Sequence, residues 1–420
     1  MTRGCLFIKI FSNSSIYFIK TLYYVYMEWV DLPLPERGSV VAVGMSGGVD
    51  STLVAMLLKE RGCNVIGITM SSWSNDLPLV ASADGVRSSC YGPDEQIDIA
   101  QCQAFCKTQE IPHYVIDVRD AYHKEVLEYF KSEYRAGRTP NPCVRCNPTV
   151  KFGALLSGAR EQGIYFDYFC TGHYAKLVRP SQDISNLYSK NKIVSTNKKN
   201  ENRPAMIRLA EDFTKDQTYF LCRVPSDVLE KVRFPLASFT KKQVFQMAQD
   251  LNLVAASRSE SQDFIPDEYL DILFSDKPSI PGDIIDLNGK KLGIHRGIEH
   301  YTIGQRRGLG VSSSRPLYVH SIDSKQNLIV LADNDDLLSS GLIADDWIWA
   351  GNFIPSEPFE ADVKIRLASK PVAAIIEPID SGKFKINFKI PQRAVAPGQA
   401  SVLYSDGVIL GGGIISESIK

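Results

Sequence analysis

The sequence predicts an α/β amino-terminal domain built on a doubly wound parallel sheet, followed by two all-β domains, a small β domain and a C-terminal β-barrel. Up to about residue 275, short apolar β-branched runs alternate with segments of helical period, which is the arrangement that gives parallel sheets. From about residue 280, short strands alternate with Gly, Asn and Asp turns, a pattern typical of meanders and barrels. A chain of 420 residues is also too long for one ordinary domain.

We place the domain boundaries where the composition changes. Residues 38–275 form the predicted catalytic α/β domain, 276–338 the small β domain and 339–420 the barrel. Residues 181–202 are polar and of low complexity, which predicts a mobile surface insertion within the first domain. Residues 1–37 are interpreted as an extension that is not part of the fold.

Bulk composition points to a cytoplasmic protein without a membrane span. Nine cysteines without a signal peptide indicate a reducing compartment. The first 26 residues are aromatic and basic, so organelle targeting is the alternative for this segment. Lys9 and Lys20 interrupt its apolar run below the length needed to cross a bilayer. A net charge of −1 shows no global signal for nucleic acid, so any RNA surface must come from local clusters.

The clearest chemical signal is a strand, a glycine loop and a helix between residues 40 and 61. Val40 to Val43 is a buried-strand run, and residues 53–58 supply the apolar face of the following helix. Free N–H groups at the start of such a helix bind anions, and the expected anion is a phosphate. The predicted ligand loop comprises Gly44, Met45, Ser46, Gly47, Gly48, Val49, Asp50 and Ser51.

Further strands and helices place other polar residues at the same sheet edge. Predicted strands cover 65–68, 113–117 and 168–170, and predicted helices cover 93–109, 122–135 and 152–163. Residues 137–142 are expected to be a loop that continues to Cys146, because two prolines and a glycine oppose regular structure. Ligands collect at the carboxyl ends of parallel strands. We therefore expect the glycine loop, Met70, Cys146 and Gly172 to meet there, with Trp73 where an adenine would lie.

The glycine loop is not a Walker A sequence, because it lacks the terminal Gly-Lys-Ser/Thr and so its phosphate-binding lysine. It resembles the SGGVDS loop of the PP-loop ATP pyrophosphatases, a HUP-like class that holds the leaving pyrophosphate while AMP is transferred to a substrate oxygen. The alternative is a glycine-rich turn in some other α/β protein.

Six separated segments, in order, resemble the tRNA-specific 2-thiouridylases. Beyond SGGVDS they are TPNPCVRCN-x-x-x-KFG from Thr139, TGHYA from Thr171, KDQTYFL from Lys215, GIHRGIEHYTIGQRRGLG from Gly293, and APGQASVLY from Ala396. The resemblance extends from Val40 to Ile415. Arg296, Arg306 and Arg307, near His295, His300 and Tyr301, form a local basic cluster suited to phosphates.

The resemblance implies that ATP with Mg²⁺ adenylates O2 of uridine 34 in tRNAs with Lys, Glu or Gln anticodons, and that sulfur then replaces that oxygen. It assigns catalysis to Asp50 and to Cys146 as the sulfur carrier, and ATP contacts to residues 44–51, Met70 and Gly172. Expected partners are tRNA and a sulfur donor such as a cysteine desulfurase or sulfur-relay protein, with a monomer as the default. The implied tRNA contacts are Asn141, Pro142, Cys143, Lys215, Asp216, Gln217, Arg306, Arg307, Arg366 and Leu367.

Two departures from the family pattern affect the sulfur chemistry. The best-known members have Asp at the position of Cys143, and a second catalytic cysteine after Glu-Ser-Gln-Asp, where this chain runs from Asp263 into Phe264. Cys143 and Cys146 are therefore expected to act either as persulfide carrier and resolving thiol or as ligands of a [4Fe-4S] cluster. Zinc is the further option. The expected additional cluster ligand is Cys90, and lower-ranked candidates are Cys170 and Cys222.

Two other functions are open at this point. A PP-loop ligase of the argininosuccinate synthase type would explain the first domain but not the Cys-x-x-Cys segment or the β domains. A non-catalytic RNA-binding protein would not need the intact Ser46 and Asp50.

Overall fold

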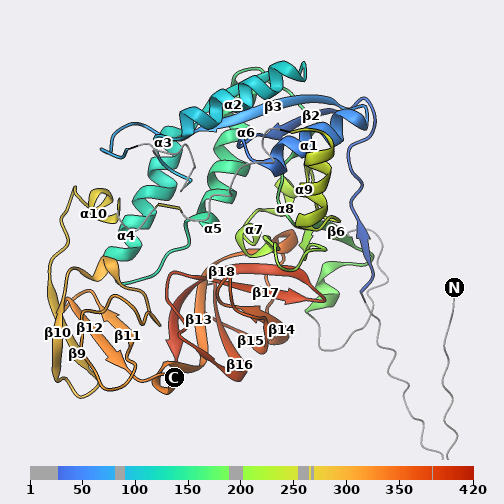
Figure 1. Ribbon diagram of the computed structural model, residues 1–420. Helices are drawn as coiled ribbons and strands as arrows, with labels where there is room; N and C mark the ends of the chain where they lie inside the picture. Colours follow the sequence, from blue (N-terminus) through green and yellow to red (C-terminus); the bar gives the residue numbers. More distant parts are fainter. Residues whose placement is uncertain (1–26, 81–89, 189–201, 254–263, 266–268, 381) are drawn as a thin grey trace, which may run out of the picture.

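A computed structural model describes residues 27–80, 90–188, 202–253, 264–265, 269–380 and 382–420. The α/β layer lies at the top of Figure 1, the small β domain at the lower left, and the C-terminal barrel below the catalytic domain. This arrangement confirms the predicted fold class. Residues 1–26, which we interpret as an extension, lie outside the described part.

The first domain is built on a parallel five-stranded sheet of order β4-β3-β2-β5-β8. Its middle strand β2 pairs in parallel with both β3 and β5, so the chain turns to opposite sides of β2 and leaves a crevice at its carboxyl end. The predicted ligand loop, residues 44–51, follows β2 directly and is called the phosphate loop below. The strands are β2 (Val40–Gly44), β3 (Asn64–Ser71), β4 (His113–Asp117), β5 (Tyr168–Cys170) and β8 (Val232–Arg233).

Helices cover both faces of this sheet, and successive side chains of β2 pack against helices on opposite faces. Val41 and Val43 pack into one apolar cluster with helices α1, α2 and α9, whereas Ala42 packs into a second cluster with the helices that follow β4. The helical segments of this domain are α1 (Val49–Glu60), α2 (Glu95–Thr108), α3 (Arg119–Tyr122), η1 (His123–Glu128), α4 (Tyr129–Arg135), α5 (Pro142–Cys146), η2 (Asn147–Ala154), α6 (Leu155–Glu161), α7 (Thr218–Leu221), α8 (Ser226–Leu229), α9 (Lys241–Asp250) and α10 (Leu270–Leu273).

The small β domain is a four-stranded sheet of order β10-β9-β12-β11 around its own apolar cluster. Its buried side chains include Ile284, Val319 and Ile329, and the residues on either side of each are only partly buried. The strands are β9 (Gly282–Asp286), β10 (Lys291–His295), β11 (Tyr318–Asp323) and β12 (Leu328–Ala332).

The C-terminal domain is a closed six-stranded barrel, because β18 pairs with both β13 and β17 and so closes the ring β18-β13-β16-β15-β14-β17. A ribbon of β1, β6 and β7 extends this sheet from the catalytic domain through the β7–β18 pairing. The strands are β1 (Trp29–Asp31), β6 (Lys176–Pro180), β7 (Met206–Arg208), β13 (Leu338–Trp349), β14 (Phe359–Lys364), β15 (Val372–Asp380), β16 (Lys383–Arg393), β17 (Ala400–Ser405) and β18 (Val408–Ile419).

Two segments contribute more to the fold than their sequence indicates. Residues 29–31 form β1, paired with β6, although we assign them to an extension outside the fold. Residues 181–188, at the start of the polar insertion, are packed: Ile184 and Tyr188 are buried in the barrel's apolar cluster. In both segments, polar neighbours in the sequence hid the apolar side chains that take part in the fold. Residues 189–201 lie outside the described part.

Within the described residues, no helix combines the length and apolar character required to traverse a bilayer.

Candidate active site

The phosphate loop is held in shape by its own hydroxyl groups. The Ser46 N–H donates to Ser51 Oγ at 3.2 Å, and Ser51 Oγ donates to the Gly48 carbonyl at 3.1 Å. Thr52 Oγ1 donates to the same carbonyl. Gly48 is the N-cap of α1, so the free N–H groups of the first helical turn lie beside the loop. The strand, loop and helix start thus have the arrangement predicted from the sequence, and anion binding there stays a prediction.

Gly172 packs directly on this loop. A Cβ atom at position 172 would lie 2.7 Å from Asp50 Cβ and 3.2 Å from the Ser51 nitrogen, so a larger residue would displace the loop backbone. The requirement for glycine here is therefore steric. Gly172 also lines a cavity along the loop, which we call the nucleotide cavity because the sequence predicts ATP there. Its other lining residues are Gly44, Met45, Ser46, Asp50, Ser51, Ile68, Met70, Lys151, Leu155, Phe169, Thr171, His173 and Gln217.

Asp50 is the acidic side chain of this cavity, and two groups from distant segments hold its carboxylate. Tyr174 donates its hydroxyl to Oδ1 at 3.0 Å. Lys241, the first residue of α9, donates Nζ to both oxygens at 2.8 Å. Sequence reasoning did not identify Lys241, because it lies 191 positions after Asp50 in the chain and no motif marks it.

The segment that carries Cys143 and Cys146 is helical, so the prediction of a loop there is wrong. Pro142–Cys146 form α5, which continues through the π-helical turn η2 into α6. Asn141 caps α5 by accepting a hydrogen bond from the Val144 N–H at 3.1 Å, and Pro142 stands at the first helical position, where its missing N–H costs nothing. The same Pro residue that suggested a loop thus begins the helix.

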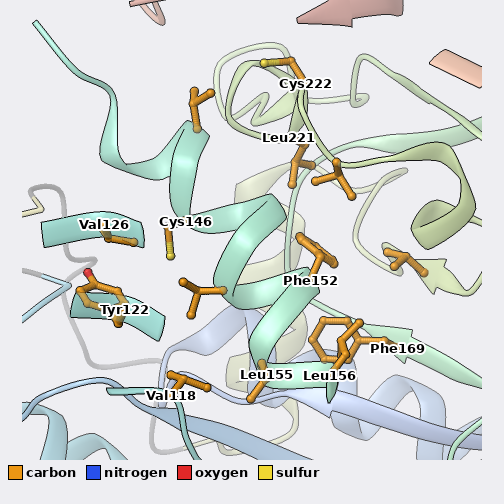
Figure 2. Close-up of a cluster of buried hydrophobic side chains, with 14 of the residues drawn as sticks. Val118, Tyr122, Val126, Cys146, Phe152, Leu155, Leu156, Phe169, Leu221 and Cys222 are labelled. Atoms are coloured by element: carbon orange, nitrogen blue, oxygen red, sulfur yellow. The ribbon is translucent and has the colours of Figure 1, made fainter. Parts of the chain in front are cut away.

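Cys146 is consequently a core residue as well as a cavity residue. It is 8% exposed and belongs to the large apolar cluster, whereas its position in a Pro-rich segment predicts little packing. Figure 2 shows its side chain directed toward Tyr122 and Val126, away from Cys222.

Three thiols line one cavity beside the phosphate loop. Cys143 and Cys146 come from α5, and Cys90 comes from the segment before α2. The cavity also contains Glu95 and Asp98, whose carboxylates are buried. The first-ranked extra cysteine, Cys90, is therefore placed with the pair. Cys170 and Cys222 line neither this cavity nor the nucleotide cavity, and Cys170 belongs to the apolar cluster on the other face of the sheet.

Burial keeps the Cys143 and Cys146 thiols protonated at neutral pH. Desolvation raises the pKa of Cys143 to about 11 and that of Cys146 to about 12, while the nearby ammonium of Lys151 acts in the opposite direction. Across the described residues, no set of three or more His, Cys, Asp or Glu side chains has the arrangement of a metal site. The donor set nevertheless suits iron–sulfur chemistry, since thiolates are the usual cluster ligands.

The thiol cavity and the nucleotide cavity adjoin. They share the lining residues Met45, Ser46, Met70 and Lys151. Lys151 is the one lysine or arginine among the described residues that line either cavity. His173 adds no charge, because burial lowers its pKa to about 3. A nucleotide on the phosphate loop would thus have its reactive end close to the thiols.

Trp73 does not occupy the expected adenine position. It is buried, lines neither cavity, and packs edge to face against Tyr91 with ring centroids 4.8 Å apart. The Glu95 carboxylate holds the turn by accepting from the Trp73 and Ser72 N–H groups at 3.1 and 2.8 Å. Trp73 therefore packs in the protein interior and does not line the predicted ligand site.

The predicted tRNA contacts divide into exposed and structural side chains. Lys215, Arg306, Arg307 and Leu367 are exposed. Asp216 accepts hydrogen bonds from Thr218 and Ala210, and Gln217 accepts one from the Tyr174 N–H, so both shape the turn beside the nucleotide cavity.

Arg366 connects two domains. Its Nη2 donates to the carbonyl oxygens of Ile303, in the loop after the small β domain's first hairpin, and of Ala394 in the barrel. Burial of this guanidinium lowers its pKa from the usual value, although it stays charged. The arginine thus fixes the segment that carries Arg306 and Arg307.

The parallel sheet and the loop after β2 are those of the PP-loop class of ATP-using domains, and a cavity lined by three thiols adjoins the loop. Sequence models match residues 39–266 (tRNA methyl transferase HUP domain), 271–333 (tRNA methyl transferase PRC-barrel domain) and 339–415 (Aminomethyltransferase beta-barrel domain). These descriptions mention methyl transfer, whereas the curated relatives are named for thiolation and span nearly the whole chain.

Two relatives show the similarity. The tRNA-specific 2-thiouridylase MnmA of Endomicrobium trichonymphae is 42% identical over 382 residues, covering 90% of this chain and 99% of the relative. The tRNA-specific 2-thiouridylase MnmA 2 of Thermoanaerobacter sp. is 40% identical over 394 residues, covering 92% and 100%. The chain belongs to the family of tRNA-specific 2-thiouridylases, which are sulfurtransferase enzymes.

Among solved structures, the U34-tRNA thiolase NcsA from Methanococcus maripaludis with its [4Fe-4S] cluster is 18% identical, covers 54% of this chain and 60% of that chain, and has a TM-score of 0.29. A similarity this low does not inform the site.

Proposed function

We propose that this enzyme uses ATP to replace O2 of uridine 34 in tRNA with sulfur. The supporting observation is that the phosphate loop and three thiols line adjoining cavities with four shared residues. A uracil carbonyl oxygen is a poor leaving group, so it must be activated at one cavity before sulfur can reach the carbon from the other.

The reaction has two steps. Uridine O2 attacks the α-phosphorus of ATP, and pyrophosphate leaves with the electron pair of the broken P–O bond. Sulfur then bonds to C2, and the C2–O bond breaks with AMP as the leaving group. Backbone N–H groups of residues 46–51 and the N-terminus of α1 would bind the phosphates. Asp50 offers the carboxylate that would hold Mg²⁺, which takes oxygen ligands from protein and phosphates.

Sulfur would be carried by Cys146 together with Cys143. In one arrangement Cys146 holds a persulfide and Cys143 attacks its inner sulfur, so that a disulfide forms and the outer sulfur is released as the nucleophile; an external thiol then reduces the disulfide. In the other, Cys90, Cys143 and Cys146 would bind a [4Fe-4S] cluster, which supplies an iron without a protein ligand for a sulfur atom. The cavity with three thiols contains the three cysteines that the cluster arrangement needs. The persulfide arrangement needs only Cys143 and Cys146.

The proposed partners are tRNAs with Lys, Glu or Gln anticodons and a sulfur-donating protein, and the proposed compartment is the cytoplasm. The exposed side chains of Lys215, Arg306 and Arg307 support phosphate contacts to the tRNA, and Asn141, Pro142 and Cys143 would lie beside the target base. A small-molecule ligase with the same phosphate loop is the weaker candidate, because it leaves the thiol cavity without a role.

The test is a reconstituted reaction. Purified chain, kept anaerobic, is incubated with unmodified tRNA transcript, Mg-ATP and a sulfur source, and the digested tRNA is analysed by nucleoside mass spectrometry. The source is inorganic sulfide for the cluster arrangement and, in a parallel reaction, a cysteine desulfurase with cysteine, which delivers persulfide sulfur for the other arrangement. We expect 2-thiouridine in transcripts with U34, none in matched transcripts with C34, and one AMP and one pyrophosphate per thiolated base. AMP formation that depends on a small molecule such as citrulline, with unchanged tRNA, would contradict the proposal.

A further inference from the structure

Phe213 is an aromatic side chain that the fold leaves in solvent. Its exposed fraction is 74%, and among the described residues only Tyr165, at 76%, is an aromatic side chain of comparable exposure. A single exposed apolar side chain is common and by itself indicates no binding site. Two further observations distinguish Phe213 from such a residue: the rigidity of the turn that carries it, and the cavity to which this turn is attached.

The turn that carries Phe213 is held in one shape by short-range hydrogen bonds. Asp212 Oδ1 accepts from the N–H and the Oγ1 of Thr214 at 3.0 and 2.6 Å, and the Lys215 N–H donates to the Asp212 carbonyl at 3.1 Å. The side chains of Phe213, Thr214 and Lys215 are nevertheless exposed. A ring on a constrained backbone loses less conformational entropy when a ligand binds than a ring on a loose loop does.

Both ends of this turn are attached to residues of the nucleotide cavity. At the amino end, Asp212 Oδ2 accepts from the Lys241 N–H at 2.9 Å, and Lys241 Nζ binds the carboxylate of Asp50 in the cavity wall. At the carboxyl end, Gln217 lines the cavity itself. Residues 213–215 therefore lie beside the nucleotide cavity and face solvent there.

An exposed phenyl ring and a lysine beside a cavity suit an unstacked nucleotide. Proteins bind single-stranded RNA through bases that stack on aromatic side chains and through phosphates that contact basic ones. Uridine 34 can bring O2 to the phosphate loop only if it leaves the base stack, and the adjacent base then loses its stacking partner. Lys215, two residues after Phe213, offers positive charge for the adjoining phosphate.

We propose that Phe213 is a stacking platform for the base next to uridine 34 in the tRNA. Its ring replaces uridine 34 as the stacking partner of that base when uridine 34 turns into the nucleotide cavity. The phenyl ring has no hydrogen-bonding atom, so it stabilises this conformation whichever base is the neighbour. The proposal deepens the proposed function and rests on it, because it takes uridine 34 as the target.

The experiment measures the affinity of the full chain for full-length tRNA by fluorescence anisotropy, in the presence of α,β-methylene ATP, which cannot transfer AMP. Phe213→Ala is expected to weaken binding about tenfold, and Phe213→Trp to bind as the wild type does. Tyr165→Ala is the matched control, because Tyr165 precedes β5 and so lies at the sheet edge opposite the phosphate loop. It should bind with wild-type affinity. Thermal unfolding verifies that each variant is folded.

A double-mutant cycle tests the stacking itself. Two further tRNAs each contain one abasic nucleotide, immediately before or immediately after uridine 34, and each is titrated with the wild type and with Phe213→Ala. At one of these positions, loss of the base should weaken binding by the wild type but leave the affinity of Phe213→Ala nearly unchanged. Additive losses at both positions would overturn the proposal, and so would wild-type affinity of Phe213→Ala for intact tRNA.

Salt dependence separates stacking from phosphate contacts. Phe213→Ala should keep the wild-type slope of log affinity against log salt concentration, whereas Lys215→Met should make the slope shallower by about one. A shallower slope in Phe213→Ala would overturn the stacking role. The proposed function is tested separately by thiolation: a chain that shows the expected coupling but forms no 2-thiouridine would contradict the proposed function and support the platform.

Discussion

The side-chain amide of Gln399 in the barrel donates hydrogen bonds to the carbonyl oxygens of Thr139 and Pro140, at 3.0 and 3.2 Å. The Thr139 N–H in turn donates to the Pro397 carbonyl at 2.8 Å. Gly398 lies so close that a Cβ atom there would be 2.9 Å from the Thr139 backbone. The barrel thus holds the backbone immediately before the cysteine helix α5, and has a role in the site beyond stability.

Gln399→Ala should therefore lower the thiolation rate at least tenfold while the protein stays folded. The substitution removes two hydrogen bonds, worth about 1 kcal/mol each, from the segment that positions Cys143 and Cys146. Single-turnover thiolation measures the effect. Gln392→Ala is the control, because that amide bonds only to neighbouring barrel carbonyls. Wild-type rates in Gln399→Ala would show that the barrel contact does not position the thiols.

Gly172→Ala should impair adenylation with little effect on global stability. Its methyl group would meet Asp50 Cβ at 2.7 Å and push the phosphate loop out of place. We expect a loss of two orders of magnitude in tRNA-dependent pyrophosphate release. Gly48→Ala, whose Cβ would make only an ordinary 3.5 Å contact with Ser46 Oγ, should lose much less. Equal losses in both variants would contradict the steric explanation.

Alkylation of the cysteine pair should depend steeply on pH. Burial raises the pKa of Cys143 to about 11 and of Cys146 to about 12, so both are thiols at pH 7 and their reaction with iodoacetamide should accelerate about tenfold per pH unit up to pH 10. Lys151→Met removes a charge that lowers both pKa values, so the variant should react more slowly at each pH. Mass spectrometry of the labelled peptides follows both sites, with the exposed Lys124 replaced by Met as control. Unchanged rates in Lys151→Met would exclude this electrostatic role.

Iron and acid-labile sulfide analysis distinguishes the two sulfur arrangements. If Cys90, Cys143 and Cys146 bind a cluster, anaerobically purified chain should be coloured and contain about four irons and four sulfides. Replacing any of the three with Ser should reduce the iron content, whereas Cys222→Ser, outside the cavity, should not. Colourless, iron-free protein that still thiolates tRNA would favour the dithiol arrangement.

Local patterns predicted the periodic elements and the phosphate loop. Val40–Val43 and the SGGVDS residues form the expected strand, loop and helix, because β-branched spacing and small residues specify them locally. The alternating strands after residue 280 form a sheet and a closed barrel for the same reason.

One error came from a misread local signal, and the others arose where tertiary contacts outweigh local chemistry. Pro142 indicated a loop but begins α5, since Asn141 supplies the cap. Trp73 follows a strand end but is held in the interior by the turn that Glu95 binds. Ile184 and Tyr188 lie in polar sequence but fill the barrel core. Lys241 carries no local signal, because only the packing of α9 on α1 brings it to Asp50.

The most direct test of the cooperation between the two cavities is 2-thiouridine formation by single-cysteine variants under anaerobic conditions with Mg-ATP and a sulfur donor, either inorganic sulfide or a cysteine desulfurase with cysteine. We expect Cys143→Ser and Cys146→Ser each to lose at least a hundredfold in thiolation while retaining ATP binding. Cys90→Ser should lose as much only if the three thiols bind a cluster, and Cys102→Ser, on the other face of the sheet, should keep full activity. Wild-type thiolation by Cys146→Ser would contradict the account.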